Sequence, residues 1–541
     1  MSDASESARD VGRGFLVITG AKLWFLVTGT VLNLALPRLL GNAARFGEFR
    51  VVNGLLTIVN MVLISGTIQA VSKRVSERES SARAVRRAAH RLQALVGGTL
   101  ALLFLAGAGP IAAVALQDEA LAPYLRLGAV VIACYAFYAV QVGVLNGLKR
   151  FAWQAALDVT FSTSKAVSMV GLVLAGFAVT GALAGFALTA LLVLGLSLLV
   201  VRRVVPRAPI GDVDGPDDVR LAGFLGQVML TTLAVNALLQ LDTVLLKALS
   251  AGPFLAVLTG ADAQARADLV AATTAALGGA APTAPDAAGL AREAASALAG
   301  LYGAAKNVAV IPYQLILSIT FVVFPLVSRA TVDHDRERTE TYVRQTLRFT
   351  TLLTTWFALM LFLARRPLLA LLFGSGYGLA GPALGLLLAG VVPFSLHVVA
   401  GTVITGAGRP GVSLALGAVS ALLATAAVGG AVAWAPGFEG ALTDAAGALL
   451  AATVVAAVLP LAWLRAAFGP VVPWATLGRV GVAAAGLVVA AAWVPLEGLA
   501  GLAVAAGLVG LGFPLALVAL GEVRGADLRR LAGMLPGRRS A

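Results

Sequence analysis

The sequence predicts an all-α integral membrane protein, and three observations support this fold class. Hydrophobic residues make up 59% of the 541 residues, whereas charged residues make up only 12%. The mean hydropathy is +0.91, and a water-soluble domain of this length could not hide that much apolar surface. Apolar segments long enough to cross a bilayer, which takes about 20 residues, recur along the whole chain.

We expect about 14 transmembrane helices from these segments. Cations concentrate in alternate loops between them, as the positive-inside rule requires. An even number of spans fits this alternation, so we expect both termini on the cytoplasmic side. The approximate spans are 14–37, 49–71, 92–116, 123–146, 155–178, 181–201, 221–249, 301–327, 346–364, 380–405, 411–434, 443–464, 474–494 and 498–520.

Composition and motifs exclude several classes of chemistry. The single cysteine, Cys134, lies in an apolar run, which excludes disulfides and thiolate metal sites. The chain has three histidines and neither a P-loop nor a zinc-binding spacing, so we predict no metal and no cofactor. The formal charge of +13 does not predict nucleic-acid binding, because the cations lie mostly in short loops between apolar runs.

Two pairs of segments indicate an internal duplication. The segment 46–74 resembles 302–329, and an alignment without a gap places Gly47 on Gly303 and Arg50 on Lys306. At nearly the same offset, the end of the fourth span (142–151) resembles the end of the tenth (403–411). Six spans in each half preserve orientation, so this is a parallel repeat. We therefore expect two pseudo-symmetric six-helix bundles plus two additional C-terminal helices.

This layout defines the expected domains. Residues 250–298 are rich in Ala, Gly, Pro, Asp and Thr, and we interpret them as an external insertion with helical flanks and a flexible middle. The expected parts are a cytoplasmic tail (1–13), an N-terminal bundle (14–203), a cytoplasmic linker (204–220), a C-terminal bundle (221–466), two more transmembrane helices (474–521) and a cytoplasmic tail (522–541).

Four stretches carry a family resemblance: GAKLWFLVTGTVLNLALPRLLG (20–41), FGEF (46–49), YGAAKNV (302–308) and RRPLLALLFGSGYGLAGPALGLLL (365–388). With them the sequence resembles the multidrug/oligosaccharidyl-lipid/polysaccharide (MOP) flippase superfamily, in particular its bacterial polysaccharide-biosynthesis branch. The resemblance implies two bundles around a central cavity, alternating access and a lipid-linked saccharide as cargo. The insertion at 250–298 departs from the family pattern by its length.

Charged residues within the spans are the candidate site. An ionisable group at bilayer depth is costly and usually faces a cavity or a partner. Isoprenoid-linked saccharides carry phosphate or pyrophosphate, which cations recognise. The resemblance supports the basic residues of the second and eighth spans in particular. The candidate cavity cations are Lys22, Arg50, Lys165 and Lys306, and the candidates for pairing or for proton or sodium coupling are Asp158, Asp242 and Lys247.

Structural alternatives remain open for these residues. Lys22 and Arg50 could extend their charged ends to a membrane interface. Lys165 lies deeper, which favours lining the cavity or pairing with Asp158. Packing alternatives also apply to three others: Asp242 and Lys247 could pair with each other or with another helix, and His397 fits hydrogen-bonded packing better than a proton relay.

The leading hypothesis is a flippase, not an enzyme, for an undecaprenyl-phosphate-type saccharide in the bacterial inner membrane. A multidrug antiporter would favour an acidic cavity, and a membrane glycosyltransferase or polymerase would need acidic catalytic residues on a large outer loop. A noncatalytic scaffold would leave the buried cations unexplained. We expect a monomer whose partners are the lipid-linked saccharide, membrane lipid and polysaccharide-assembly proteins.

Overall fold

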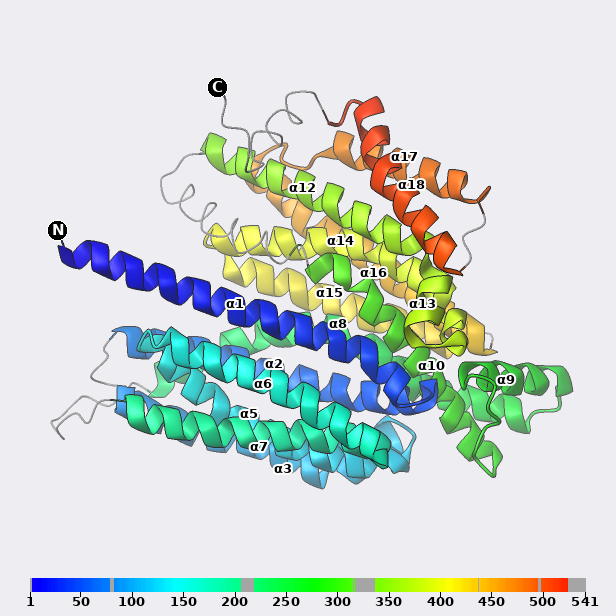
Figure 1. The fold of residues 1–541 in the computed structure, drawn as a ribbon, viewed down its shortest axis with the longest axis horizontal. Helices are drawn as coiled ribbons and strands as arrows, with labels where there is room; N and C mark the ends of the chain where they lie inside the picture. The colour runs from blue at the N-terminus through cyan, green and yellow to red at the C-terminus, as the bar shows by residue number, and fades with distance from the viewer. Residues whose placement is uncertain are drawn as a thin grey trace. The chain divides into compact units, whose positions relative to one another are not determined.

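The computed structural model describes residues 2–77, 82–205, 218–314, 316, 336–435, 437–494 and 498–523, and within these it is helical with no strand. Figure 1 shows the helices as long rods. They are α1 (Ser2–Leu39), α2 (Ala43–Glu77), α3 (Ala82–Ala106), α4 (Ala108–Pro110), α5 (Ala122–Gly147), α6 (Phe151–Leu172), α7 (Ala178–Val204), α8 (Asp218–Thr259), α9 (Ala263–Ala276), α10 (Ala287–Ala309), α12 (Arg336–Leu363), α13 (Arg365–Phe373), α14 (Gly381–Gly406), α15 (Pro410–Ala433), α16 (Gly437–Phe468), α17 (Trp474–Ala491) and α18 (Gly498–Ala519).

Thirteen segments of the described chain are long and apolar enough to cross a bilayer. One of them, Phe151–Val204, has 54 residues, or about 80 Å of helix, far more than one crossing needs. It holds α6 and α7, which pack side by side and are joined by the π-helical segment η4 (Val173–Phe177), where Gly176 has φ +93°. The segment therefore turns back on itself and supplies two spans, which confirms the expected count of about 14.

Several element boundaries differ from the expected ones. The expected loop 73–91 is mostly helix, because α2 continues to Glu77 and α3 begins at Ala82. The expected eighth span began at 301, but its helix, α10, begins at Ala287; the part of that expected span beyond 316 lies outside the described residues. Hydropathy excluded residues 287–300 from the span because they carry charges, whereas their alanines favour helix, so the expected helical flank and the span form one helix.

The segment 250–298, which was expected as an insertion between two spans, is mostly helical. It contains the end of α8, all of α9 and the start of α10, so the expected helical flanks are confirmed. Asp262 caps α9 by accepting hydrogen bonds from the Gln264 and Ala265 backbone N–H groups (2.9 and 3.0 Å). The turn before α10 is held to that helix, because the Thr283 backbone N–H donates a hydrogen bond to the Glu293 carboxylate of α10 at 2.9 Å.

The chain divides into two compact units. The first comprises Met1–Gly303 and Gly429–Ala441, and the second comprises Ala304–Val428 and Leu442–Ala541. The expected linker between bundles, 204–220, lies mostly outside the described residues, so that boundary stays a prediction.

In the first unit, α2 packs against α5 and α8, while α1 lies along α6 (Figure 1). The contact of α2 with α10 is made by small residues. A Cβ atom added at Gly47 would lie 1.8 Å from the Ser296 carbonyl oxygen, and one at Gly300 would lie 1.9 Å from that of Ala43. The two backbones therefore touch, an approach that only small residues permit. This α2–α10 seam fixes the position of the side chains that follow it.

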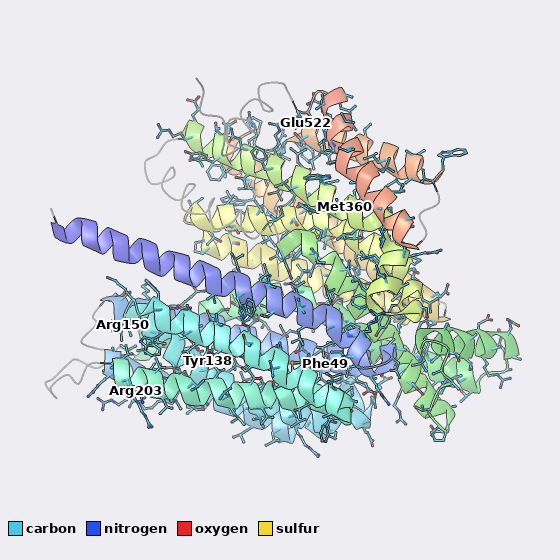
Figure 2. The ribbon with its side chains drawn as sticks, in the orientation of Figure 1. Phe49, Tyr138, Arg150, Arg203, Met360 and Glu522 are labelled. Carbon is cyan, nitrogen blue, oxygen red and sulfur yellow. The ribbon has the colours of Figure 1, made fainter. Side chains whose placement is uncertain are left out.

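Figure 2 places Phe49 and Tyr138 among the helices of the first unit, whereas Arg150 and Arg203 lie together at one end of it. Arg150 precedes α6 and Arg203 lies in the last turn of α7. The two loops expected to share a membrane side because of their cations thus lie at the same end of this unit.

In the second unit, Glu522 lies just beyond the end of α18 and connects it to α12 and α17 (Figure 2). Its carboxylate accepts hydrogen bonds from Arg348 Nε at 2.7 Å, Thr476 Oγ1 at 2.7 Å and Arg479 Nη1 at 3.0 Å. Burial alone would raise the pKa of Glu522, but these hydrogen bonds outweigh burial and hold the pKa below its ordinary value. An apolar cluster of α12, α13, α17 and α18 lies beside it and includes the half-buried Met360.

Candidate functional site

Arg50 on α2 is the centre of a buried polar network in the first unit. It lies one turn beyond the α2–α10 seam, and a Cβ atom added at Gly303 would come within 2.7 Å of Arg50 Cγ. The glycine therefore leaves room for the arginine side chain. Arg50 Nε is buried without a hydrogen-bond partner, and the negative charge that acts on the guanidinium is that of Asp242.

Asp242, on α8, is held in place by two donors. Its carboxylate accepts a hydrogen bond from the Tyr302 hydroxyl of α10 at 3.0 Å and one from the Thr243 backbone N–H at 2.8 Å. Tyr302 is fully buried. Residues of α2, α8 and α10 thus meet around one half-buried arginine and one buried carboxylate.

Lys247, one and a half turns further along α8, is also fully buried. Its Nζ lies 2.7 Å from Asp118 Oδ2 and 2.5 Å from Ser296 Oγ. Of the two expected pairings, with Asp242 or with another element, the structure has the second. The partner, Asp118, caps the short 3₁₀ helix η3 (Glu119–Leu121) before α5.

Lys22 and Asp158 form a separate ion pair between α1 and α6, with Lys22 Nζ 2.8 Å from Asp158 Oδ2. The Lys22 side chain is 55% exposed and that of Asp158 only 12%. The expected alternative of a Lys165–Asp158 pair is therefore wrong. Lys165 Nζ lies 3.9 Å from the ring centroid of Phe186 and 5.8 Å from that of Phe161, so aromatic faces receive its charge.

The remaining two candidates lie in the second unit. Lys306 is buried in the last turn of α10. His397 on α14 is buried with its Nδ1 at 2.9 Å from the Ala456 carbonyl oxygen, which fits the packing role expected for it. The structure thus distributes the seven predicted site residues among the Arg50 network, the Lys22–Asp158 pair, the Lys165 aromatic contact and Lys306.

Glu48 is a charged neighbour of the Lys247–Asp118 pair that sequence reasoning missed. It precedes Arg50 by two residues on α2, and its carboxylate lies within the electrostatic influence of Lys247 and Asp118. Glu48 lies in the FGEF stretch (46–49), so its position two residues before Arg50 could have indicated it as a candidate. Within the described residues, no group of three or more His, Cys, Asp or Glu side chains could hold a metal ion.

The guanidinium of Arg50 can bind an anion other than the Asp242 carboxylate. Arg50 can form bidentate hydrogen bonds with a phosphate or a carboxylate, and its only charged neighbour named above is Asp242. Because three helices contribute to the network, a change of partner at Arg50 would alter the contacts between α2, α8 and α10.

Comparison with known proteins agrees with this fold. A family described as polysaccharide biosynthesis protein matches residues 35–251 and 290–380, more than half of the chain. The structure of the lipid II flippase MurJ, in an inward closed conformation, is similar with a TM-score of 0.66 and 12% identity over 95% of this chain and 100% of that chain. No curated protein matches the chain in sequence.

Two further solved structures share the fold. An inward-facing multidrug resistance MATE family transporter of the MOP superfamily aligns with a TM-score of 0.58 and 17% identity, over 83% of this chain and 95% of that chain. A MOP superfamily transporter from Pyrococcus furiosus aligns with a TM-score of 0.53 and 17% identity, over 85% of this chain and 96% of that chain.

The apolar helices and these matches define a multi-pass, all-α membrane protein with the fold of the MurJ and MATE structures. Within that class, the chain belongs to the polysaccharide biosynthesis protein family.

Proposed function

We propose that this protein is a flippase that moves an undecaprenyl-phosphate- or pyrophosphate-linked saccharide from the inner to the outer leaflet of the bacterial cytoplasmic membrane by alternating access. Its family takes part in polysaccharide biosynthesis, and such pathways need their lipid-linked precursors carried across a bilayer. The likeness to the lipid II flippase supports a fold suited to that cargo.

The proposal rests mainly on one observation at Arg50. Its buried Nε has no hydrogen-bond partner, so the guanidinium has donor capacity left for an incoming anion. A phosphate oxygen at this position would form charge-assisted hydrogen bonds in a low-dielectric setting, where they are strong. Lys306 is the repeat-related cation, and we propose that it contacts the same headgroup during the transport cycle.

A multidrug or cation antiporter is the alternative, and the buried acids weigh against it. A cationic drug requires a carboxylate that is not already neutralised. Asp118 is bound by Lys247 at 2.7 Å and Asp158 by Lys22 at 2.8 Å. Asp242 lies beside Arg50 and keeps its place in the network, where proton or sodium coupling remains our proposal for it.

Purified protein in liposomes tests the function. The vesicles contain a fluorescent undecaprenyl-pyrophosphate disaccharide, and a membrane-impermeant quencher reports the fraction in each leaflet. Wild-type protein should exchange the label between leaflets faster than empty vesicles do, and a fluorescent cationic drug should not be exchanged. No acceleration for the saccharide would overturn the proposed function, and acceleration for the cation alone would establish the antiporter.

The role of Arg50 is tested with matched variants. Arg50→Ala should abolish flipping, whereas Arg45→Ala, which removes an exposed cation from the same helix, should keep it. Because Arg50→Ala leaves Asp242 without its cation, the double variant Arg50→Ala/Asp242→Asn restores the charge balance and the folding. Flipping at the wild-type rate in the double variant would show that Arg50 only balances Asp242, and would remove it from the site.

The orientation is the last part of the proposal. Both termini should face the cytoplasm, and reporter domains fused to either end should be active only there.

A further inference from the structure

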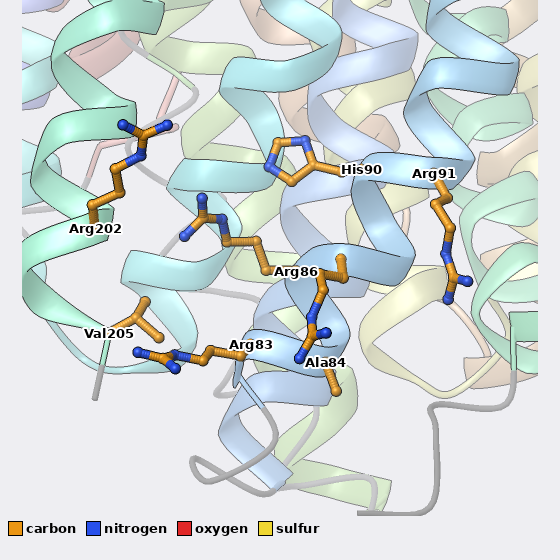
Figure 3. A pocket seen from close by; sticks show the side chains of 8 residues that line it. Arg83, Ala84, Arg86, His90, Arg91, Arg202 and Val205 are labelled. Carbon is orange, nitrogen blue, oxygen red and sulfur yellow. The ribbon is translucent and has the colours of Figure 1, made fainter. Parts of the chain in front are cut away.

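A basic pocket in the first unit lies outside the network described above. It has a volume of about 770 Å³ and is lined by α3 and by the end of α7. Figure 3 shows Arg83, Arg86 and Arg202 gathered on one side of α3, with His90 next to Arg86. The lining residues are Arg83, Ala84, Arg86, Arg87, His90, Arg91, Arg202 and Val205.

The helical repeat explains why so many cations share one pocket. Arg83, Arg86, Arg87 and His90 recur at intervals of three and four residues, which places them on one face of α3. His90 is fixed by Gln141 of α5, whose Nε2 lies 2.7 Å from His90 Nε2, and by stacking on Phe137. The face of α3 that lines the pocket is therefore basic, and His90 is held in place on it.

Three arginines of this pocket, Arg83, Arg86 and Arg202, have no carboxylate partner among the described residues. Arg86 lies within the repulsive field of both Arg83 and Arg202. Among the described lining residues there is no Asp or Glu, and no ion pair joins these three arginines to a described carboxylate. Several like charges at short range are unfavourable unless an anion joins them. The pocket thus has the electrostatics of an anion site.

Exposed apolar faces continue from the pocket along both helices. On α3, Leu95, Leu102 and Leu105 follow Arg91 at helical spacing and are 68%, 66% and 47% exposed. On α7, Leu188, Leu191 and Leu199 precede Arg202 at the same kind of spacing and are each more than half exposed. An anion that binds here can therefore be attached to hydrocarbon chains.

We infer that this pocket binds the headgroup of an anionic membrane phospholipid that carries two phosphates, with its acyl chains along α3 and α7. The four arginines Arg83, Arg86, Arg87 and Arg202, together with this volume, exceed what one phosphate needs. Basic pockets between transmembrane helices at the cytoplasmic surface bind such headgroups, and the sequence predicts that this end of α3 is cytoplasmic. The site is distinct from the one that we propose for the transported saccharide.

Lipid retention measured by native mass spectrometry tests this site on the full chain, without any transport cargo. The protein is delipidated and then titrated with cardiolipin, with phosphatidylglycerol, or with inorganic phosphate as a competitor. Wild-type protein should bind one cardiolipin at least ten-fold more tightly than phosphatidylglycerol. Arg86→Gln/Arg202→Gln should weaken cardiolipin binding by about ten- to thirty-fold, whereas Arg203→Gln, the exposed neighbour outside the pocket, should not.

The folding of the variants is checked by thermal unfolding without lipid. Removing Arg86 and Arg202 relieves repulsion, so the double variant should be at least as stable as the wild type. Equal affinity for the two lipids, an unchanged affinity in the double variant, or displacement by inorganic phosphate at the concentration of the lipid would each overturn the inference. Displacement by undecaprenyl-pyrophosphate disaccharide in preference to cardiolipin would instead assign the pocket to the cargo.

Discussion

Replacing Gly47 with alanine should separate α2 from α10. The new Cβ atom would lie 1.8 Å from the Ser296 carbonyl oxygen, 2.7 Å from its carbonyl carbon and 2.8 Å from the Gly300 backbone nitrogen. All three are backbone atoms, so no side chain can rotate away, and one helix must move by more than 1 Å to restore van der Waals contact. Overpacking of this kind costs about 1–3 kcal/mol.

The matched control lies on the same helix. A Cβ atom added at Gly54 would meet its nearest atom, Val244 Cγ2, at 3.6 Å, which is ordinary contact. Alanine favours helix over glycine by about 1 kcal/mol, so Gly54→Ala should be neutral or stabilising while Gly47→Ala is destabilising. Thermal unfolding in detergent measures both. Equal stability of Gly47→Ala and the wild type would refute the close approach of the two helices.

Three further predictions concern charge and backbone geometry. Glu522→Gln should destabilise the protein by about 1–3 kcal/mol at neutral pH. The pKa of Glu522 is lowered in the folded state, so the stabilisation by its carboxylate is complete above the ordinary carboxyl pKa and is lost as pH falls through the folded-state pKa. The urea unfolding curves of variant and wild type should therefore converge in acid. Lys247→Met should cost about 3–5 kcal/mol because it leaves Asp118 buried and unpaired, and Lys247→Met/Asp118→Asn should recover most of that loss in a thermal melt; a double variant as unstable as the single one would contradict the pair. Gly176→Ala, at φ +93° with no atom near the added Cβ, should cost about 1–2 kcal/mol through backbone strain alone, so a melting temperature equal to that of the wild type would argue against this conformation.

The fold could be predicted from the sequence because bilayer spans are defined by length and hydropathy, which are local properties. The boundaries that failed are those where helix extends beyond the apolar segment. The first turns of α10 carry Arg292 and Glu293, so hydropathy separated them from the eighth span as a helical flank, although they belong to the same helix. The sequence predicts a break close to Gly176, because the expected spans 155–178 and 181–201 must be separated there.

The candidate site was predicted in its residue types but not in its partners. Arg50 was found because a cation in an apolar helix is rare. Its neighbours are separated from it by long stretches of chain, so no spacing rule could pair it with Asp242, or Lys247 with Asp118. Lys165 was expected to line the cavity or to pair with Asp158, which lies on the same helix; the rings of Phe161 and Phe186 lie next to its Nζ instead.

The Lys247–Asp118 contact joins residues 129 positions apart. At a translation rate of about 5–20 residues per second, the carboxylate leaves the ribosome roughly 6 to 26 seconds before its lysine does. During that interval the nascent protein holds an uncompensated acid near the membrane, and a truncated product that ends before α8 would hold it permanently. Such a fragment lacks the lysine that compensates Asp118, so it should be less stable than the full chain.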